Sequence, residues 1–201
     1  MLSRYQQDQE KYGYILHPII SNKPIAIRVM KFEHGINYQI LDKIIEQLDI
    51  ILIKYSRVLV TLLNFHVNKY STNNKALSDF NKKVMRIVKS KYGKTLGYIW
   101  VREINDSINQ HYHFAYFLNG HKIKHPLQFN QLLMRIWKED FSGHSSIPKY
   151  CFSFIDRNKQ NYLDTIFGCL YRLSYLAKNF SKQYKNKKAK SYQASRLKYP
   201  D

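Results

Sequence analysis

The sequence has few acidic residues, few cysteines and no long apolar run. Aspartate and glutamate total 14 of the 201 residues, against 33 lysines and arginines, so the formal net charge is +19 at pH 7. The two cysteines, Cys151 and Cys169, match no zinc spacing and are too few for a disulfide framework, which excludes a disulfide-stapled module. The most apolar stretch, residues 44–53, is interrupted by Glu46 and Asp49, which excludes a membrane-spanning helix.

Linkers, repeats and a secretory signal are also lacking. No glycine- or serine-rich segment divides the chain, and the first residues, MLSRYQQDQEKYGY, contain no apolar signal region. With 44% hydrophobic residues the chain can bury a core, so disorder of the whole chain is excluded. We expect a cytoplasmic protein with a loosely packed N-terminal arm (1–35), one folded domain (36–182) and a basic C-terminal tail (183–201).

The basic surplus is densest near the C-terminus. Residues 178–198 read KNFSKQYKNKKAKSYQASRLK, with seven lysines, one arginine and no acid. Aromatic residues between the charges are typical of surfaces that follow phosphates and stack bases, whereas a membrane helix would need a continuous apolar face. Codon bias in an AT-rich genome also enriches lysine, so a merely lysine-rich protein stays open. The residues predicted to contact DNA are Tyr171, Lys182, Lys185, Lys187, Lys188, Lys190 and Arg196.

Apolar periodicity predicts an α+β fold. Alternating apolar and polar residues, or short apolar runs, mark strands, and a 3–4-residue spacing marks helices. The arrangement we predict is an antiparallel β-sheet with helices packed on one face, of ferredoxin-like type. The predicted helices are 36–55, 73–92, 126–141 and 162–182, and the predicted strands are 57–67, 95–103, 110–118 and 149–156.

Two histidines lie one strand step apart in the segment QHYHFAYFL, residues 110–118. Alternation places His111 and His113 on one face of the sheet and the aromatic residues between them on the other. If the loop 104–110 closes an antiparallel hairpin, Glu103 lies opposite His111 and points to the same face. Two imidazoles and a carboxylate form an open site for a divalent cation such as Mg²⁺ or Mn²⁺. A chance pair of surface histidines is the alternative.

A tyrosine and a lysine share one face of the last predicted helix. Tyr171, Tyr175, Lys178 and Lys182 follow a 4-3-4 spacing, which places them on the same side. A phenol one turn before an ammonium group can act as a nucleophile whose developing charge is neutralised. The chain has 17 tyrosines, so such a match also arises by chance.

Taken in order, these motifs resemble those of HUH endonucleases, the replication initiators and relaxases that nick single-stranded DNA. The closer resemblance is to inovirus-type replication proteins and prophage proteins with a YagK/YfjJ C-terminal domain. The matching segments are GYIWVREI at 97–104, QHYHFAYFLNG at 110–120, RLSYLAK at 172–178 and SYQASR at 191–196.

The resemblance implies a role for each matching residue. It implies that His111, His113 and Glu103 bind the metal, that Tyr175 is the nucleophile, and that Lys178 assists at the phosphate. Asn64 stands where the first motif of such proteins often carries an acid. We therefore predict only a structural role for the strand 57–67 and treat His66 as incidental.

The activity implied is that of a metal-dependent nickase and ligase that initiates rolling-circle replication of a phage or prophage-like element in a bacterial cytoplasm. The implied partners are single-stranded DNA at the replication origin and the host helicase and polymerase. A non-catalytic DNA-binding regulator on the same fold is the alternative. The lack of an acid at position 64 favours it, whereas the intact set of Glu103, His111, His113 and Tyr175 argues against it. A structural zinc or RNA-binding module is disfavoured by the lack of a ligand cluster.

Overall fold

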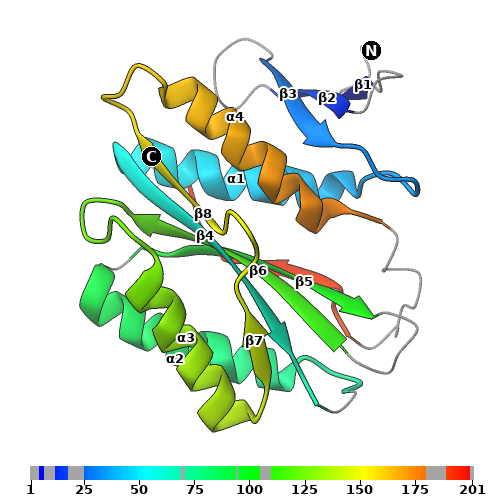
Figure 1. Cartoon of the computed structure of the whole chain (residues 1–201), viewed down its shortest axis with the longest axis vertical. Helices are drawn as coiled ribbons and strands as arrows, with labels where there is room; N and C mark the ends of the chain where they lie inside the picture. The colour runs from blue at the N-terminus through cyan, green and yellow to red at the C-terminus, as the bar shows by residue number, and fades with distance from the viewer. Residues whose placement is uncertain are drawn as a thin grey trace.

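A six-stranded antiparallel sheet runs through the centre of the structure (Figure 1). The computed structural model describes residues 5–6, 12–17, 25–68, 71–93, 95–104, 110–179 and 189–199. The strand order is β7-β4-β6-β5-β9, and β8 pairs with β4 on the same edge as β7. The strands are β4 (Arg57–His66), β5 (Gly97–Ile104), β6 (Gln110–Asn119), β7 (His144–Ser146), β8 (Phe152–Asp156) and β9 (Tyr192–Ala194).

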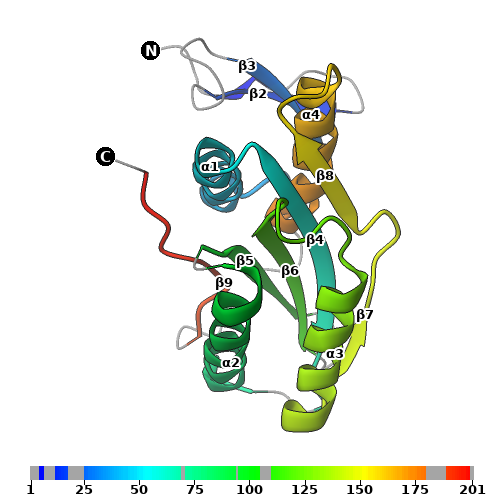
Figure 2. The same cartoon turned by 90° about the vertical axis from the view of Figure 1, so that its left-hand side faces the viewer.

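Helices cover both faces of this sheet, as the side view shows (Figure 2). On one face α1 and α4 bury a core with Val58 and Val60 of β4, and on the other α2 and α3 pack on Leu59 and Leu63. The helices are α1 (Tyr38–Lys54), α2 (Lys75–Tyr92), α3 (Leu127–Phe141) and α4 (Tyr162–Leu173). The predicted α+β class with helices on an antiparallel sheet is confirmed.

The distribution of the helices corrects one detail of the prediction, which placed them all on one face. Consecutive residues of β4 are apolar, so both of its faces need cover from water. A sheet that is apolar on both sides is stable only between two layers. The chain therefore forms three layers, and the face that carries the predicted metal ligands is partly covered.

The N-terminal segment adds a small second sheet. Strands β1 (Tyr5–Gln6), β2 (Tyr12–His17) and β3 (Ile25–Met30) pair in that order, and β3 lies along α4 (Figure 1). Ile27 and Val29 are buried in the same core as α1 and α4. Where the sequence predicted a loosely packed arm, β3 is part of the folded core.

The last helix is shorter than the predicted 162–182. It ends as an α-helix at Leu173 and continues as the 3-10 turn η1 (Ser174–Ala177). At Lys178, with φ −55° and ψ 137°, the backbone leaves the helical conformation. Residues 189–199 are folded as well, because β9 pairs with β5 and Leu197 packs on the core. None of the described helices combines the length and the apolar character that crossing a membrane requires.

Candidate functional site

The hairpin of β5 and β6 brings the predicted ligands together. Glu103 lies opposite His111, and Val101 lies opposite His113, which is the predicted register. The alternate residues Tyr112 and Phe114 are buried on the face that α2 and α3 cover. The two imidazoles and the carboxylate therefore share the opposite face, next to the end of α4. We predicted a face free of helices, and the structure instead brings η1 over this part of it.

Both nitrogens of His113 have partners. Nε2 lies 3.0 Å from Oε2 of Glu103, and Nδ1 lies 2.7 Å from Oδ1 of Asn64, the residue opposite His113 on β4. Hydrogen bonds of this kind fix the orientation and the protonated nitrogen of an imidazole. Asn64 of β4 thus orients His113, a contact that the sequence analysis did not predict.

The tautomer of His113 decides to which of these partners the ring donates. With the hydrogen on Nε2 the ring donates to the Glu103 carboxylate, and with the hydrogen on Nδ1 it donates to Oδ1 of Asn64. Imidazole nitrogens and carboxylates are also groups that bind divalent cations, so the residue types at this place are compatible with a metal.

The described residues do not form a closed metal-binding arrangement. Within the described ranges, no group of three or more His, Cys, Asp or Glu side chains could hold a metal ion as they stand. Glu103 and His113 are instead joined by a hydrogen bond. His111 lies directly opposite Glu103 on the same face of the sheet. A cation bound here would replace the bond between Glu103 and His113.

A further histidine belongs to this cluster. His66 lies opposite His111 on β4, with the two ring centroids 4.4 Å apart and edge to face, and His144 of β7 lies opposite His66. Burial, followed by repulsion from His111 and its neighbours, lowers the pKa of His66. Burial and then His113 lower the pKa of His111. The sequence left His66 as incidental, because only the β4–β6 register shows that it faces His111.

We predict that this cluster makes the protein less stable in mild acid. Because the folded pKa of His66 lies below its ordinary value of 6.5, the unfolded chain binds more protons, and stability is lost as the pH falls below about 6.5. In His66→Asn the loss of unfolding free energy between pH 7.5 and pH 5 should be smaller than in the wild type. Urea denaturation at each pH measures it.

The pH dependence of stability must be compared between the wild type and His66→Asn, because Asp49 titrates in the same pH range as the histidines. Burial raises the pKa of Asp49 to about 6, so its own contribution to stability falls as the pH rises from about 4 to 6. This contribution is common to the wild type and the variant and cancels in the difference. His125→Asn, at an exposed histidine outside the cluster, is the control. Equal pH profiles for the wild type and His66→Asn would contradict the prediction.

The turn η1 places Tyr175 and Lys178 on the cluster. A 3-10 helix has three residues per turn, so side chains three apart are aligned. The rings of Tyr175 and His113 meet edge to face at 5.6 Å, and Nζ of Lys178 lies 3.8 Å from Oε1 of Glu103. Nζ also lies 5.2 Å from the centroid of the Tyr175 ring. Tyr175 keeps 37% of its surface exposed, which leaves it accessible to a ligand.

Contacts from the N-terminal segment hold η1 in this position. The Ser174 hydroxyl is buried, donates to the carbonyl of Tyr171 at 2.6 Å and accepts from the backbone N–H of Met30 at 2.9 Å. The Phe32 ring packs edge to face on Tyr175 at 6.0 Å. No sequence pattern predicts these contacts between the end of β3 and η1.

The other residues predicted to contact DNA lie on α4, beside β9, or outside the described residues. Tyr171 lies beside Arg28 of β3, whose guanidinium carbon is 5.8 Å from the ring centroid. Lys190 and Arg196 flank β9 at the edge of the sheet, where Tyr192 lies opposite Val101, the residue that pairs with His113. The other four predicted residues lie outside the described residues: Lys182, Lys185, Lys187 and Lys188.

Comparison with known proteins gives one family. The family model described as the YagK/YfjJ C-terminal domain matches residues 22–193, a span that includes β3, the hairpin, η1 and most of β9. No curated protein and no solved structure matches the chain.

Proposed function

The chain belongs to the YagK/YfjJ C-terminal domain family, and we propose that it is an HUH-type endonuclease that nicks single-stranded DNA to initiate rolling-circle replication of a phage or prophage-like element. The observation that carries the proposal is the meeting of Tyr175 and Lys178 with His113 and Glu103 at one place on the sheet. These residues come from three separate segments of the chain, and their chemistry matches a phosphoryl-transfer site.

In the proposed reaction Tyr175 is the nucleophile. Its phenolic oxygen attacks the scissile phosphorus, the O–P bond to tyrosine forms, and the bond from phosphorus to the 3′ oxygen breaks. The phenolic proton goes to solvent and the leaving oxygen takes one up, which gives a 5′-phosphotyrosine and a free 3′-hydroxyl. The covalent link preserves a phosphodiester, so the strand can later be rejoined.

Lys178 has two roles in this proposal. Its ammonium group lies near both the Tyr175 ring and the Glu103 carboxylate, so it can offset the negative charge that develops on the attacking oxygen. Through Glu103 it is also linked to His113. Removing the ammonium group should slow the chemical step more than it weakens DNA binding.

A divalent cation, Mg²⁺ or Mn²⁺, would be held by His111, His113 and Glu103, with His66 beside them. When bound, it would polarise the scissile phosphate. Asn64 would keep His113 oriented, and the neutral state of His66 and His111 that their lowered pKa values favour is the state in which imidazole binds a metal.

The experiment that tests the proposal is direct detection of the covalent intermediate. The protein is incubated with single-stranded DNA, carrying a label at each end in separate reactions, in the presence of Mn²⁺. A denaturing gel should show a protein–DNA band that retains the label 3′ of the nick, together with a released strand that ends in a 3′-hydroxyl. A non-catalytic regulator would bind the DNA and give neither product.

We predict that the basic residues at β9 add to DNA affinity through phosphate contacts. Affinity for a single strand should fall with salt, with a slope in the logarithmic plot of about −0.7 for each phosphate contacted. Lys190→Ala with Arg196→Ala should make that slope shallower by about 1.4 in a fluorescence-anisotropy titration.

Point substitutions are used here because residues 189–199 form the edge strand and its flanks, which a deletion would remove. The matched control is Lys122→Ala with Lys124→Ala, two exposed lysines in the connection between β6 and α3. If both double variants change the slope equally, the effect is one of net charge and the predicted contact at β9 is wrong.

A further inference from the structure

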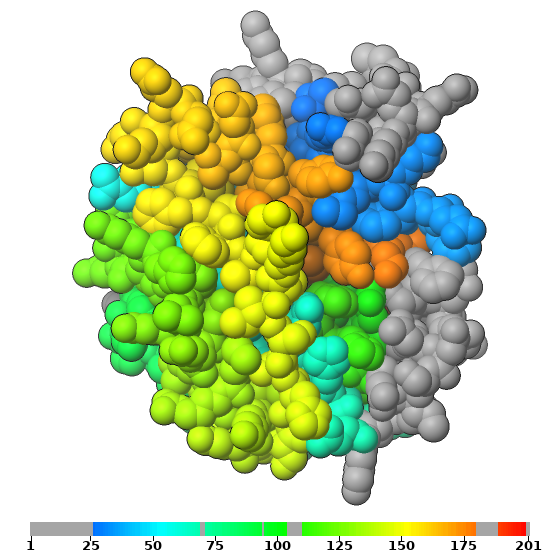
Figure 3. Space-filling view, in the orientation of Figure 1, coloured from blue at the N-terminus to red at the C-terminus, as the bar shows by residue number. Residues whose placement is uncertain are grey.

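A hollow lies directly beside Tyr175. In Figure 3, β4 in cyan and β6 in green lie at the bottom of a recess between the yellow loop before β8 and the orange end of α4. The cavity has a volume of about 280 Å³, and Tyr175, His113 and Asn64 form part of its wall. The proposed nucleophile, the candidate metal ligand and its orienting residue therefore border one open recess.

The lining of the cavity combines apolar and polar surface. Met30, Leu62, Pro148 and Leu176 provide the apolar part. Arg172 and Lys149 bring positive charge to the same cavity, and Asn64 adds a side-chain amide. Binding sites for small ligands typically have apolar walls with a few placed polar groups. A flat apolar body attached to phosphate, as in a nucleotide, matches this combination.

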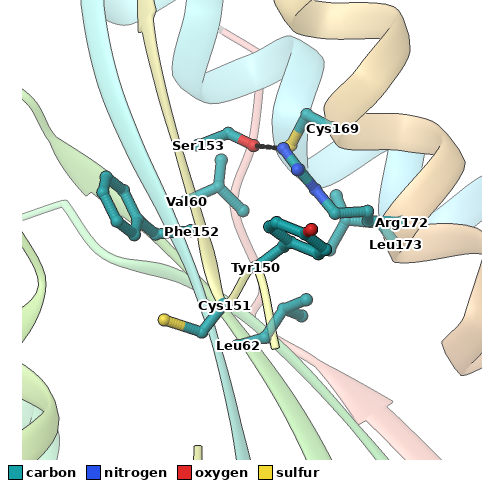
Figure 4. A pocket seen from close by; sticks show the side chains of 9 residues that line it. All are labelled: Val60, Leu62, Tyr150, Cys151, Phe152, Ser153, Cys169, Arg172 and Leu173. Atoms are coloured by element: carbon teal, nitrogen blue, oxygen red, sulfur yellow. Dashed lines mark hydrogen bonds between the residues drawn. The ribbon is translucent and has the colours of Figure 1, made fainter. Parts of the chain in front are cut away.

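Arg172 is held in place at this cavity. Its guanidinium donates to the hydroxyl of Ser153 on β8, as the dashed line in Figure 4 shows. Arg172 and Leu62 line both this cavity and a smaller hollow that Tyr150 also lines, so the two lie side by side. A guanidinium fixed by a neutral hydroxyl keeps other N–H groups for a phosphate oxygen.

Tyr150, which lines the smaller hollow and follows Lys149 of the cavity wall, has an unusual backbone conformation. Its φ angle is +56°, in the left-handed region that a bulky residue seldom adopts, and 69% of its surface is exposed. Nζ of Lys149 lies 5.2 Å from the centroid of its ring. An exposed aromatic ring with a cation on it is the arrangement on which unpaired bases stack.

We propose that this cavity takes one unstacked base of the DNA strand, next to the phosphate that Tyr175 attacks. Arg172 and Lys149 contact the phosphates on either side of that nucleotide, and Tyr150 stacks the following base. The base in the cavity fixes the strand relative to Tyr175 and makes cleavage depend on the nucleotide at that position. This inference rests on the proposed function, since it places the substrate of that reaction.

The test uses binding and does not depend on cleavage. A set of single-stranded oligonucleotides, each with one base removed at a successive position, is titrated against Tyr175→Phe by anisotropy. One position should stand out with an affinity loss of about fivefold or more, the equivalent of one stacked base. Leu62→Trp, which fills the cavity, should remove the difference between that position and the others.

Tyr150 provides a second arm with a conservative control. Tyr150→Ala should weaken binding of the intact strand by about fivefold or more, and Tyr150→Phe, which keeps the ring, should bind as the wild type does. If base removal has the same effect at every position, or if Tyr150→Ala and Tyr150→Phe bind equally, the inference is overturned. A covalent adduct with no preferred position would overturn it while sparing the proposed nicking activity. A preferred position without any covalent adduct would support base binding in the cavity and contradict the proposed nicking activity.

Discussion

The variant Tyr175→Phe should form no covalent adduct with single-stranded DNA. Phenylalanine keeps the ring that packs edge to face on Phe32 and His113, so the fold and the cavity should persist. It lacks the oxygen that would attack phosphorus, so adduct formation and nicking should fall by at least about a thousandfold. Denaturing gels measure the adduct, and anisotropy should show DNA affinity within about twofold of the wild type.

Tyr171→Phe is the matched control, since it makes the same change one helical turn earlier. Tyr171 lies beside Arg28 on the β3 side of α4, whereas Tyr175 borders the cavity with His113. Adduct formation should therefore survive in Tyr171→Phe. If the two variants behave the other way round, the reaction class survives and the assignment of the nucleophile is wrong. If neither variant loses the adduct on a substrate that the wild type cleaves, the tyrosine mechanism must be abandoned.

The second large effect is expected at Glu103. The residue is 7% exposed, and its carboxylate joins His113 through one oxygen and Lys178 through the other. Glu103→Gln keeps the shape of the side chain but removes the charge that would bind a cation and hold the ammonium group. Nicking under single-turnover conditions should fall by about a hundredfold or more, the equivalent of losing about 3 kcal/mol or more of transition-state stabilisation.

Metal dependence separates this effect from a loss of structure. Glu103→Gln should need a higher Mn²⁺ concentration for half-maximal nicking, and calorimetric titration should show weaker Mn²⁺ binding. Glu139→Gln makes the same change at an exposed carboxylate on α3 and should leave both measurements unchanged. A Glu103→Gln protein that nicks within about threefold of the wild type would show that this carboxylate neither binds the metal nor orders Lys178.

The position of the cluster also explains why Asn64 can stand where an acid was expected. Asn64 lies on the side of His113 away from Glu103 and contributes a neutral carbonyl oxygen to Nδ1. A neutral acceptor orients the ring without adding a second negative charge to the site. The absence of an acid at this position is therefore compatible with the proposed activity.

The sequence alone determined the local part of this site. The alternation in QHYHFAYFL fixed His111 and His113 on one face, and the short loop before it fixed Glu103 opposite His111, since both follow from strand geometry and the hairpin register. Four helices and the longer strands were likewise predictable from apolar periodicity. The proximity of Tyr175 and Lys178 was also predictable, because it follows from their three-residue spacing.

Only the tertiary structure decided what surrounds that local part. His66 and Asn64 reach the histidines because β4 pairs with β6, and a helix and a strand separate these two strands in the sequence. The 3-10 turn that aims Tyr175 at His113 is held by β3 through Ser174, a contact between distant ends of the chain. The packing of helices on both sheet faces is decided in the same way. Periodicity reports which side of an element is apolar, but register and docking depend on partners that are remote in sequence, and no local pattern encodes them.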